Sequence, residues 1–80
     1  METVTVTLTE QEMHRIYIAL RSFAREQQAK ACEEREFAKS ARKFEDEECA
    51  LDCDAAAESA QRISEFYYAD AEKISKLLGL

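Results

Sequence analysis

The side chains with the greatest chemical potential in this sequence are three cysteines and one histidine. Cys49 and Cys53 are four residues apart and would share one face of a helix. Together with Cys32 and His14 they offer the thiolate and imidazole groups that bind zinc. The spacing disfavours such a site, because no CxxC pair is present and His14 is distant in the chain. Small thiols are common in protein cores, so we predict no metal site and no cofactor.

His14 is the only histidine of the chain and invites a catalytic interpretation. No serine or cysteine is spaced to pair with it, and it lies between Met13 and Arg15, near the start of a predicted helix, where we expect a half-exposed surface position. A slender helical chain of 80 residues also offers little concavity in which a pair of carboxylates would lose water. The sequence therefore predicts a protein that is not an enzyme.

A dense acidic cluster lies in the middle of the chain. Its members, which occupy ten positions without one basic residue, are Glu45, Asp46, Glu47, Glu48, Asp52 and Asp54. The cluster lacks the alternating aspartates and the turn glycine of a calcium-binding loop. One interpretation is a solvated turn between helices, and the other is a contact surface for a basic protein partner. The same charge argues against direct binding of nucleic acid.

Charge is divided unevenly along the chain, whose net charge is −6. Residues 10–44 carry eight Lys and Arg against six Asp and Glu, while residues 45–80 carry three against ten. Two such segments attract each other when they lie side by side, although one exposed ion pair contributes only about 0.2–1 kcal/mol. The asymmetry therefore favours packing of the two halves against each other.

The hydrophobic pattern changes period near the N-terminus. Val4, Val6 and Leu8 alternate with threonines, which predicts a β-strand over residues 3–8. Thr9 and Glu12 then form the signature of a capping box, so we expect a helix to begin directly after the strand. Since no second strand-like run follows, the strand should self-associate with a second copy or pair with the sheet edge of another protein. A loose N-terminal segment is the alternative.

The rest of the chain predicts two long helices, over residues 10–44 and 47–78. The sequence has no proline, and its one glycine, Gly79, lies where the second helix should end. The reversal falls at 45–48 with Asp46 as the helix cap, and the later aspartates of the acidic cluster are alternative caps. We predict one mainly α domain over residues 1–80, in which the short strand precedes a long antiparallel helical hairpin. A break near 27–32 would give a three-helix bundle instead.

Apolar residues of the second helix recur close to every 3.5 positions, as in a coiled coil. They are Cys53, Ala56, Ala60, Ile63, Tyr67, Ile74 and Leu77. The three aromatic residues at 66–68 are consecutive, so they cannot all point into one thin hairpin. We therefore expect Tyr68, together with Ile18 of the first helix, to form an exposed apolar contact.

No apolar run approaches the roughly 18 residues of a membrane-spanning helix, and we expect a cytoplasmic protein with no membrane contact. Residues 3–23, TVTVTLTEQEMHRIYIALRSF, and the small, acidic, helical style of the chain resemble orphan proteins carried by bacteriophages and mobile elements. Some of these, including anti-CRISPR proteins, cover or mimic a ligand surface on a host complex. The resemblance implies a host protein complex as partner and the host-cell cytoplasm as location.

These observations together predict a non-enzymatic, homodimeric protein-binding module. Its predicted role is that of a phage-type inhibitor, which presents the acidic cluster or the exposed aromatic residues to its target. One alternative is a structural or assembly protein that acts mainly through self-association. Another is a small metal-binding regulator that uses Cys32, Cys49 and Cys53.

Overall fold

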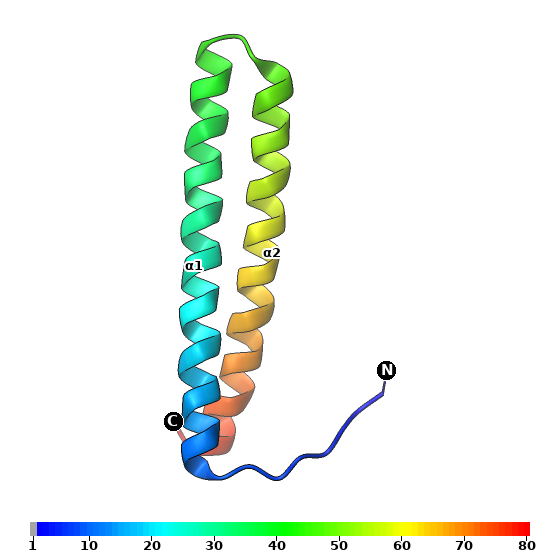
Figure 1. Cartoon of the computed structure of the whole chain (residues 1–80), viewed down its shortest axis with the longest axis vertical. Helices are drawn as coiled ribbons and strands as arrows, with labels where there is room; N and C mark the ends of the chain where they lie inside the picture. The colour runs from blue at the N-terminus through cyan, green and yellow to red at the C-terminus, as the bar shows by residue number, and fades with distance from the viewer. Residues whose placement is uncertain (1) are drawn as a thin grey trace.

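The computed structural model describes residues 2–80 and contains two antiparallel helices, α1 (Glu10–Lys43) and α2 (Glu47–Leu78). They lie side by side along their whole length, with the turn at one end and the two chain termini at the other (Figure 1). The prediction of a mainly α, antiparallel hairpin is confirmed. The three-helix bundle is wrong, because α1 runs unbroken through 27–32, a stretch made almost entirely of good helix formers.

The start of α1 has the predicted capping box. The backbone N–H of Glu12 donates to the Thr9 hydroxyl at 3.1 Å, and the backbone N–H of Thr9 donates to the Glu12 carboxylate at 3.1 Å. Two amides that would lack partners at the helix end are thereby satisfied. The helix therefore begins where the local sequence dictates.

The reversal takes only three residues, Phe44 to Asp46, and contains no glycine. Glu45 adopts a positive φ of 58°, a conformation that is uncommon for residues other than glycine. The Asp46 side chain accepts a hydrogen bond from the backbone N–H of Cys49 at 3.1 Å and so caps α2, as the sequence predicted. At the other end, Gly79 has a φ of 74° and closes α2 in the left-handed conformation that its missing Cβ permits.

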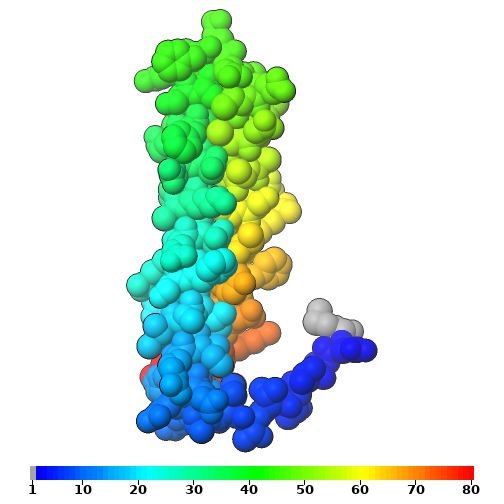
Figure 2. Space-filling model, viewed as in Figure 1, coloured from blue at the N-terminus to red at the C-terminus, as the bar shows by residue number. Residues whose placement is uncertain are grey.

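Residues 2–8, which we call the arm, are not the predicted strand. The arm runs outward from the start of α1 and stands clear of the helices over most of its length (Figure 2). Val4 and Val6 are 84% and 67% exposed. A strand is stable only when another strand supplies hydrogen-bond partners, and residues 2–80 form no second strand. Residues 3–8 therefore have the alternating sequence of a β-strand but do not form one in this structure.

The contact between the helices is built at strict intervals of seven, from one tyrosine at the terminal end and from small residues along the rest, and we call this set the seam. Its members are Tyr17, Ala24, Ala31 and Ala38 on α1 and Ala50, Ala57, Ser64 and Ala71 on α2. All of them except Tyr17 are at most 2% exposed. The hydroxyl of Ser64 donates to the backbone carbonyl of Ala24 at 2.9 Å, which fixes the register. The same step of seven places Ala31 opposite Ala57 and Ala38 opposite Ala50.

The predicted repeat on α2 is half correct. Cys53, Ala60, Tyr67 and Ile74 are covered and alternate with the seam residues. Ile63 and Leu77, by contrast, are 39% and 75% exposed, and Ala56 is only half-buried. The inward positions between the covered residues are taken instead by Ala57, Ser64 and Ala71, because small side chains let two helix backbones approach closely.

The molecule is one layer of helices thick. Its principal-axis extents are 54, 26 and 14 Å, and its radius of gyration is 17.1 Å. A compact domain of 80 residues has a radius of gyration of about 12 Å. A single layer buries only the inner side of each helix, whereas stable domains usually pack two layers around a core. The large side chains on the outer sides of α1 and α2 are therefore left without internal partners.

Candidate interaction surfaces

The seam divides each helix into two flanks, and the antiparallel pairing turns these flanks into two broad faces. Residues four positions after a seam residue lie on one flank, and residues one position before it lie on the other. We call the first set the polar face and the second set the apolar face. The two faces differ sharply in chemistry.

Every position of the polar face carries a polar side chain. These positions are Arg21, Gln28, Arg35 and Arg42 on α1 and Asp54, Gln61, Tyr68 and Ser75 on α2. The contacts cross between the helices: Arg42 donates to Asp54 at 2.6 Å, and the Tyr68 hydroxyl lies 3.5 Å from the Gln28 side-chain oxygen. The hydrogen bond to Asp54 raises the pKa of Arg42. The polar face therefore satisfies much of its own hydrogen-bonding capacity.

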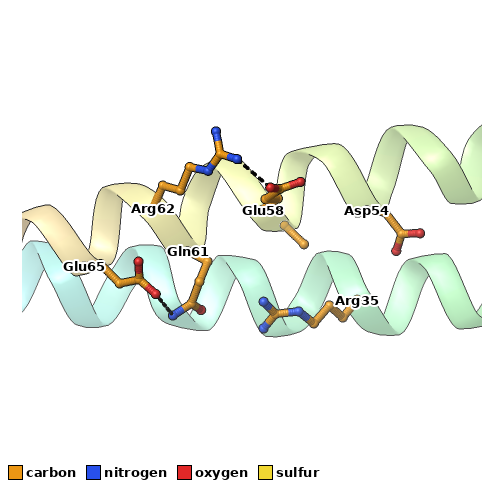
Figure 3. Close-up of a pocket in the computed structure, with 7 residues that line it drawn as sticks. Arg35, Asp54, Glu58, Gln61, Arg62 and Glu65 are labelled. Atoms are coloured by element: carbon orange, nitrogen blue, oxygen red, sulfur yellow. Dashed lines mark hydrogen bonds and ion pairs between the residues drawn. The ribbon is translucent and has the colours of Figure 1, made fainter.

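Two open hollows lie along the polar face. One, of about 330 Å³, lies between Arg35 of α1 and Asp54 and Gln61 of α2 (Figure 3). On α2, Arg62 pairs with Glu58 at 2.6 Å, and Gln61 donates to Glu65 at 3.3 Å. These four side chains, which line the hollow, are therefore already engaged with one another. The second hollow is lined by Tyr17, Arg21, Tyr68, Ala71, Glu72 and Ser75. Neither hollow gathers side chains in an arrangement that indicates catalysis.

The apolar face is a stripe of large side chains that runs from the terminal end of the hairpin to the turn. Its members are Ile16, Phe23, Phe37 and Phe44 from α1 and Ile63 and Leu77 from α2, with Phe66 on its outer margin. They are between 36% and 82% exposed. Two charged residues, Lys30 and Asp70, interrupt the stripe. Phe23 also packs edge-to-face on Tyr67, with ring centroids 4.6 Å apart, so the stripe is continuous with the seam.

The concentration of large apolar side chains on this face is the main asymmetry of the surface. The structure exposes thirteen large hydrophobic residues, and seven of them belong to the apolar face. Four others are in the arm or at the C-terminus, and only Ile18 and Leu51 lie elsewhere on the helices. Scattered exposed apolar residues need no explanation, but a contiguous patch of this kind marks an interaction site.

The acidic cluster is partly engaged within the chain. Asp46 caps α2, and Glu47 and Asp54 both pair with Arg42, at 3.5 and 2.6 Å. Five of the six residues are exposed, and only Asp54 is half-buried. Within residues 2–80, the structure gives the side chains of Asp46, Glu47 and Asp54 an intramolecular hydrogen bond or ion pair, while those of Glu45, Glu48 and Asp52 are exposed without one.

The predicted apolar contact residues, Ile18 and Tyr68, lie on the polar side of the hairpin. Ile18 is 61% exposed and lines a small hollow with Tyr17 and Arg21, and Tyr68 lines the neighbouring hollow with the same two residues. Arg21 donates to the Tyr17 hydroxyl at 3.0 Å and lies over the Tyr17 ring. The exposure predicted for Ile18 is confirmed, but Tyr68 is half-buried because it packs across the polar face toward Gln28.

The three cysteines do not converge. Cys49 and Cys53 are neighbours on α2, while Cys32 is exposed on the other side of the seam. Within residues 2–80, no three His, Cys, Asp or Glu side chains are grouped so that they could hold a metal ion. His14 is exposed in the first turns of α1 and lines none of the hollows described above. The trio Cys32, Cys49 and Cys53 therefore gives no support to a metal-binding regulator.

Sequence reasoning missed the apolar face, although its signal is present in the chain. Ile16, Phe23, Phe37 and Phe44 are separated by multiples of seven, and each of the first three stands directly before a seam residue. Large apolar side chains at such spacing are usually assigned to the core, which hides this face from sequence reasoning. If the alanines at intervals of seven are placed at the helix contact instead, the core is assigned correctly and the phenylalanines lie outside it.

The sequence matches no protein-family model, and comparisons with curated proteins and with solved structures give no match either. Neither α1 nor α2 is long and apolar enough to cross a membrane. The assignment of function therefore rests on the surfaces described above.

Proposed function

We propose that this chain is a non-enzymatic protein-interaction module, a helical rod that works by packing its apolar face against helices of a partner. The observation that carries the proposal is the inverted distribution of apolar side chains. Within residues 2–80, all seven buried hydrophobic residues are alanines, while thirteen large hydrophobic residues are exposed. A protein whose bulky apolar side chains lie outside gains most of its hydrophobic stabilisation when that surface is covered.

The free energy of burying apolar side chains explains why a partner on the apolar face would stabilise the chain. Burial of one large apolar side chain contributes about 1.5–3 kcal/mol, whereas an alanine methyl group contributes roughly 0.8 kcal/mol. Phe37 and Phe66 are 52% and 71% exposed, so most of their possible contribution is unused in the single chain. A partner that covers the apolar face would recover it. The polar face offers no comparable gain, because its side chains already pair across the seam.

The role of an inhibitor that presents the acidic cluster to a basic target stays a prediction. Three exposed carboxylates, Glu45, Glu48 and Asp52, are the part of the cluster available to such a target. Charge of this kind steers encounter more than it provides affinity. Within the proposal, the acidic end therefore selects partners and the apolar face binds them.

Site-specific photo-crosslinking tests the proposal. A benzophenone amino acid is introduced in place of Phe37 on the apolar face and, as a matched control, in place of Ile18 on the opposite side of the hairpin, in cells that express the chain. Both positions are more than half exposed and lie on α1. We expect a discrete protein adduct from position 37 and none from position 18. An adduct from position 18 alone, or from neither position, would contradict the proposal.

A further inference from the structure

We infer that the partner of the apolar face is a second copy of this chain, and that two hairpins stack face to face as a four-helix bundle with both turns at the same end. The inference rests on the proposed function and names its partner. In this bundle the apolar faces of the two copies pack against each other. They form a central layer between the two seams, and the three layers together make one larger core.

The surface area of the chain fits this partner. The chain exposes 6421 Å², whereas a compact monomer of 9.2 kDa exposes about 4,900 Å². The excess is about 1,500 Å² per chain, and permanent homodimers bury roughly 1,000–2,500 Å² per subunit. The exposed arm accounts for part of this excess, and the outer sides of the two helices account for the rest, so the surplus is of the order that a dimer of this chain would remove from water.

The pattern of apolar positions also fits a bundle better than an isolated hairpin. A helix that pairs with one neighbour needs apolar residues at two positions in seven, while a helix in a bundle needs a third. α1 supplies that third position with Ile16, Phe23 and Phe37, each directly before a seam residue, and α2 supplies it with Ile63 and Leu77. The stripe of large side chains extends over the length of α1 and over the second half of α2. A second hairpin has the same length and the same stripe, so the two surfaces are self-complementary.

Charge selects the orientation. Two face-to-face arrangements have two-fold symmetry: with the turns at opposite ends, α1 packs on the partner's α1, and with the turns at the same end, α1 packs on the partner's α2. Residues 10–44 carry a net positive charge and residues 45–80 a strongly negative one. The second arrangement places unlike helices together at both new contacts. It also brings the two acidic clusters to one end, where Arg42 of each chain pairs with Glu47 and Asp54 and neutralises part of the charge, so the contacts along the helices favour it.

Absolute molar mass from light scattering tests the inference. We expect the wild-type chain to have twice its mass of 9.2 kDa at micromolar concentration. The double variant Phe37→Glu/Ile63→Glu should lower the dimer population at least tenfold, because it buries two charges at the new interface. The matched control, Ile18→Glu/Leu51→Glu, adds the same charge at exposed apolar positions off the face and should remain dimeric.

Because a hairpin separated from its partner leaves its apolar face exposed to water and is less stable, a third variant strengthens the interface instead. Lys30→Leu fills the gap in the stripe on α1 and should lower the dissociation constant of the dimer about tenfold. A folded wild-type monomer at every concentration would overturn the inference, and so would a Lys30→Leu variant that dimerises more weakly. A foreign protein as the sole adduct at position 37 would likewise overturn it while leaving the proposed function intact.

The orientation has its own readout. A spin label in place of Glu48, which points away from the seam near the turn, should report one inter-chain distance in the dimer. With both turns at the same end the labels lie roughly 30 Å apart, whereas opposite ends separate them by about 50 Å, the length of α2. The longer distance would overturn the proposed arrangement.

Discussion

The Cys53 thiol shows how the seam alters a single side chain. It lies half-buried between the helices, next to Cys49 and Glu34. Loss of solvent disfavours its thiolate form, and the hydrogen bond with Cys49 and the negative charge of Glu34 act in the same direction. Together they raise the pKa of Cys53 from 9.0 to about 11. Cys53 is therefore an unreactive thiol in the folded chain.

We predict that iodoacetamide at pH 9 modifies Cys53 tens of times more slowly in the folded protein than in the same protein unfolded in urea, since only the thiolate reacts. Mass spectrometry of the modified peptides measures both rates, and the exposed Cys32 in the same sample serves as the reference. Because folding raises the pKa of Cys53, the protonated thiol contributes to the stability of the folded chain. This contribution is fully present below about pH 9 and is lost as the pH rises to about 11. Equal rates for Cys53 in both states would contradict the assignment.

Residue-scale features were predictable where the physical cause is local. The Thr9–Glu12 capping box and the Asp46 cap follow from hydrogen bonds between residues three positions apart, and a sequence displays such pairs directly. The turn conformation of Glu45 was not predictable in this way. Its positive φ results from closure of the hairpin by the seam, and no local residue type announces it.

At the scale of helices, the sequence predicts that two helices exist and roughly where they end. A ranking by hydrophobicity, however, assigns to the core large side chains that lie on the exposed flank of each helix. The cause is that alanine is weakly hydrophobic and Phe23, Phe37 and Ile63 are strongly so, and the ranking of hydrophobicity favours the large residues. In a pair of helices the inner position is decided by how closely the backbones approach. Small residues at a strict interval of seven therefore take the seam, and large ones take the flank.

The seam predicts a clear difference between two equivalent substitutions. Ala31 is fully buried opposite α2, and Ala29 is exposed on the outside of the same helix. Ala31→Leu should lower the free energy of unfolding by about 1–3 kcal/mol, because the larger side chain forces the helices apart, while Ala29→Leu should change it by less than about 0.5 kcal/mol. Urea denaturation at one fixed chain concentration measures both. A more stable Ala31→Leu variant would show that the seam is loosely packed.

At the scale of the whole molecule, the structure leaves two regions largely uncovered by the rest of the chain, and these are the surfaces on which the proposed partner would bind. One layer of helices with an alanine core leaves the apolar face uncovered, and the arm, with its strand-like pattern, has no strand to pair with. Sequence reasoning assigned self-association to Val4, Val6 and Leu8, because alternation in an unpaired segment is a recognised signal. The apolar face offers a larger surface for the same purpose, so the arm and the face are competing sites for self-association.

Removal of residues 1–7 distinguishes these two sites. The shortened chain keeps Leu8, which is only 36% exposed, and the capping Thr9, and its N-terminus is acetylated to avoid a positive charge at the start of α1. Because Val4 and Val6 are largely exposed, we expect helix content by circular dichroism to be unchanged and the free energy of unfolding to shift by less than about 0.5 kcal/mol. We also expect the dimer to persist, because the apolar face is intact. A folded monomer after truncation would assign dimerisation to the arm. In that case the apolar face would be left for a foreign partner.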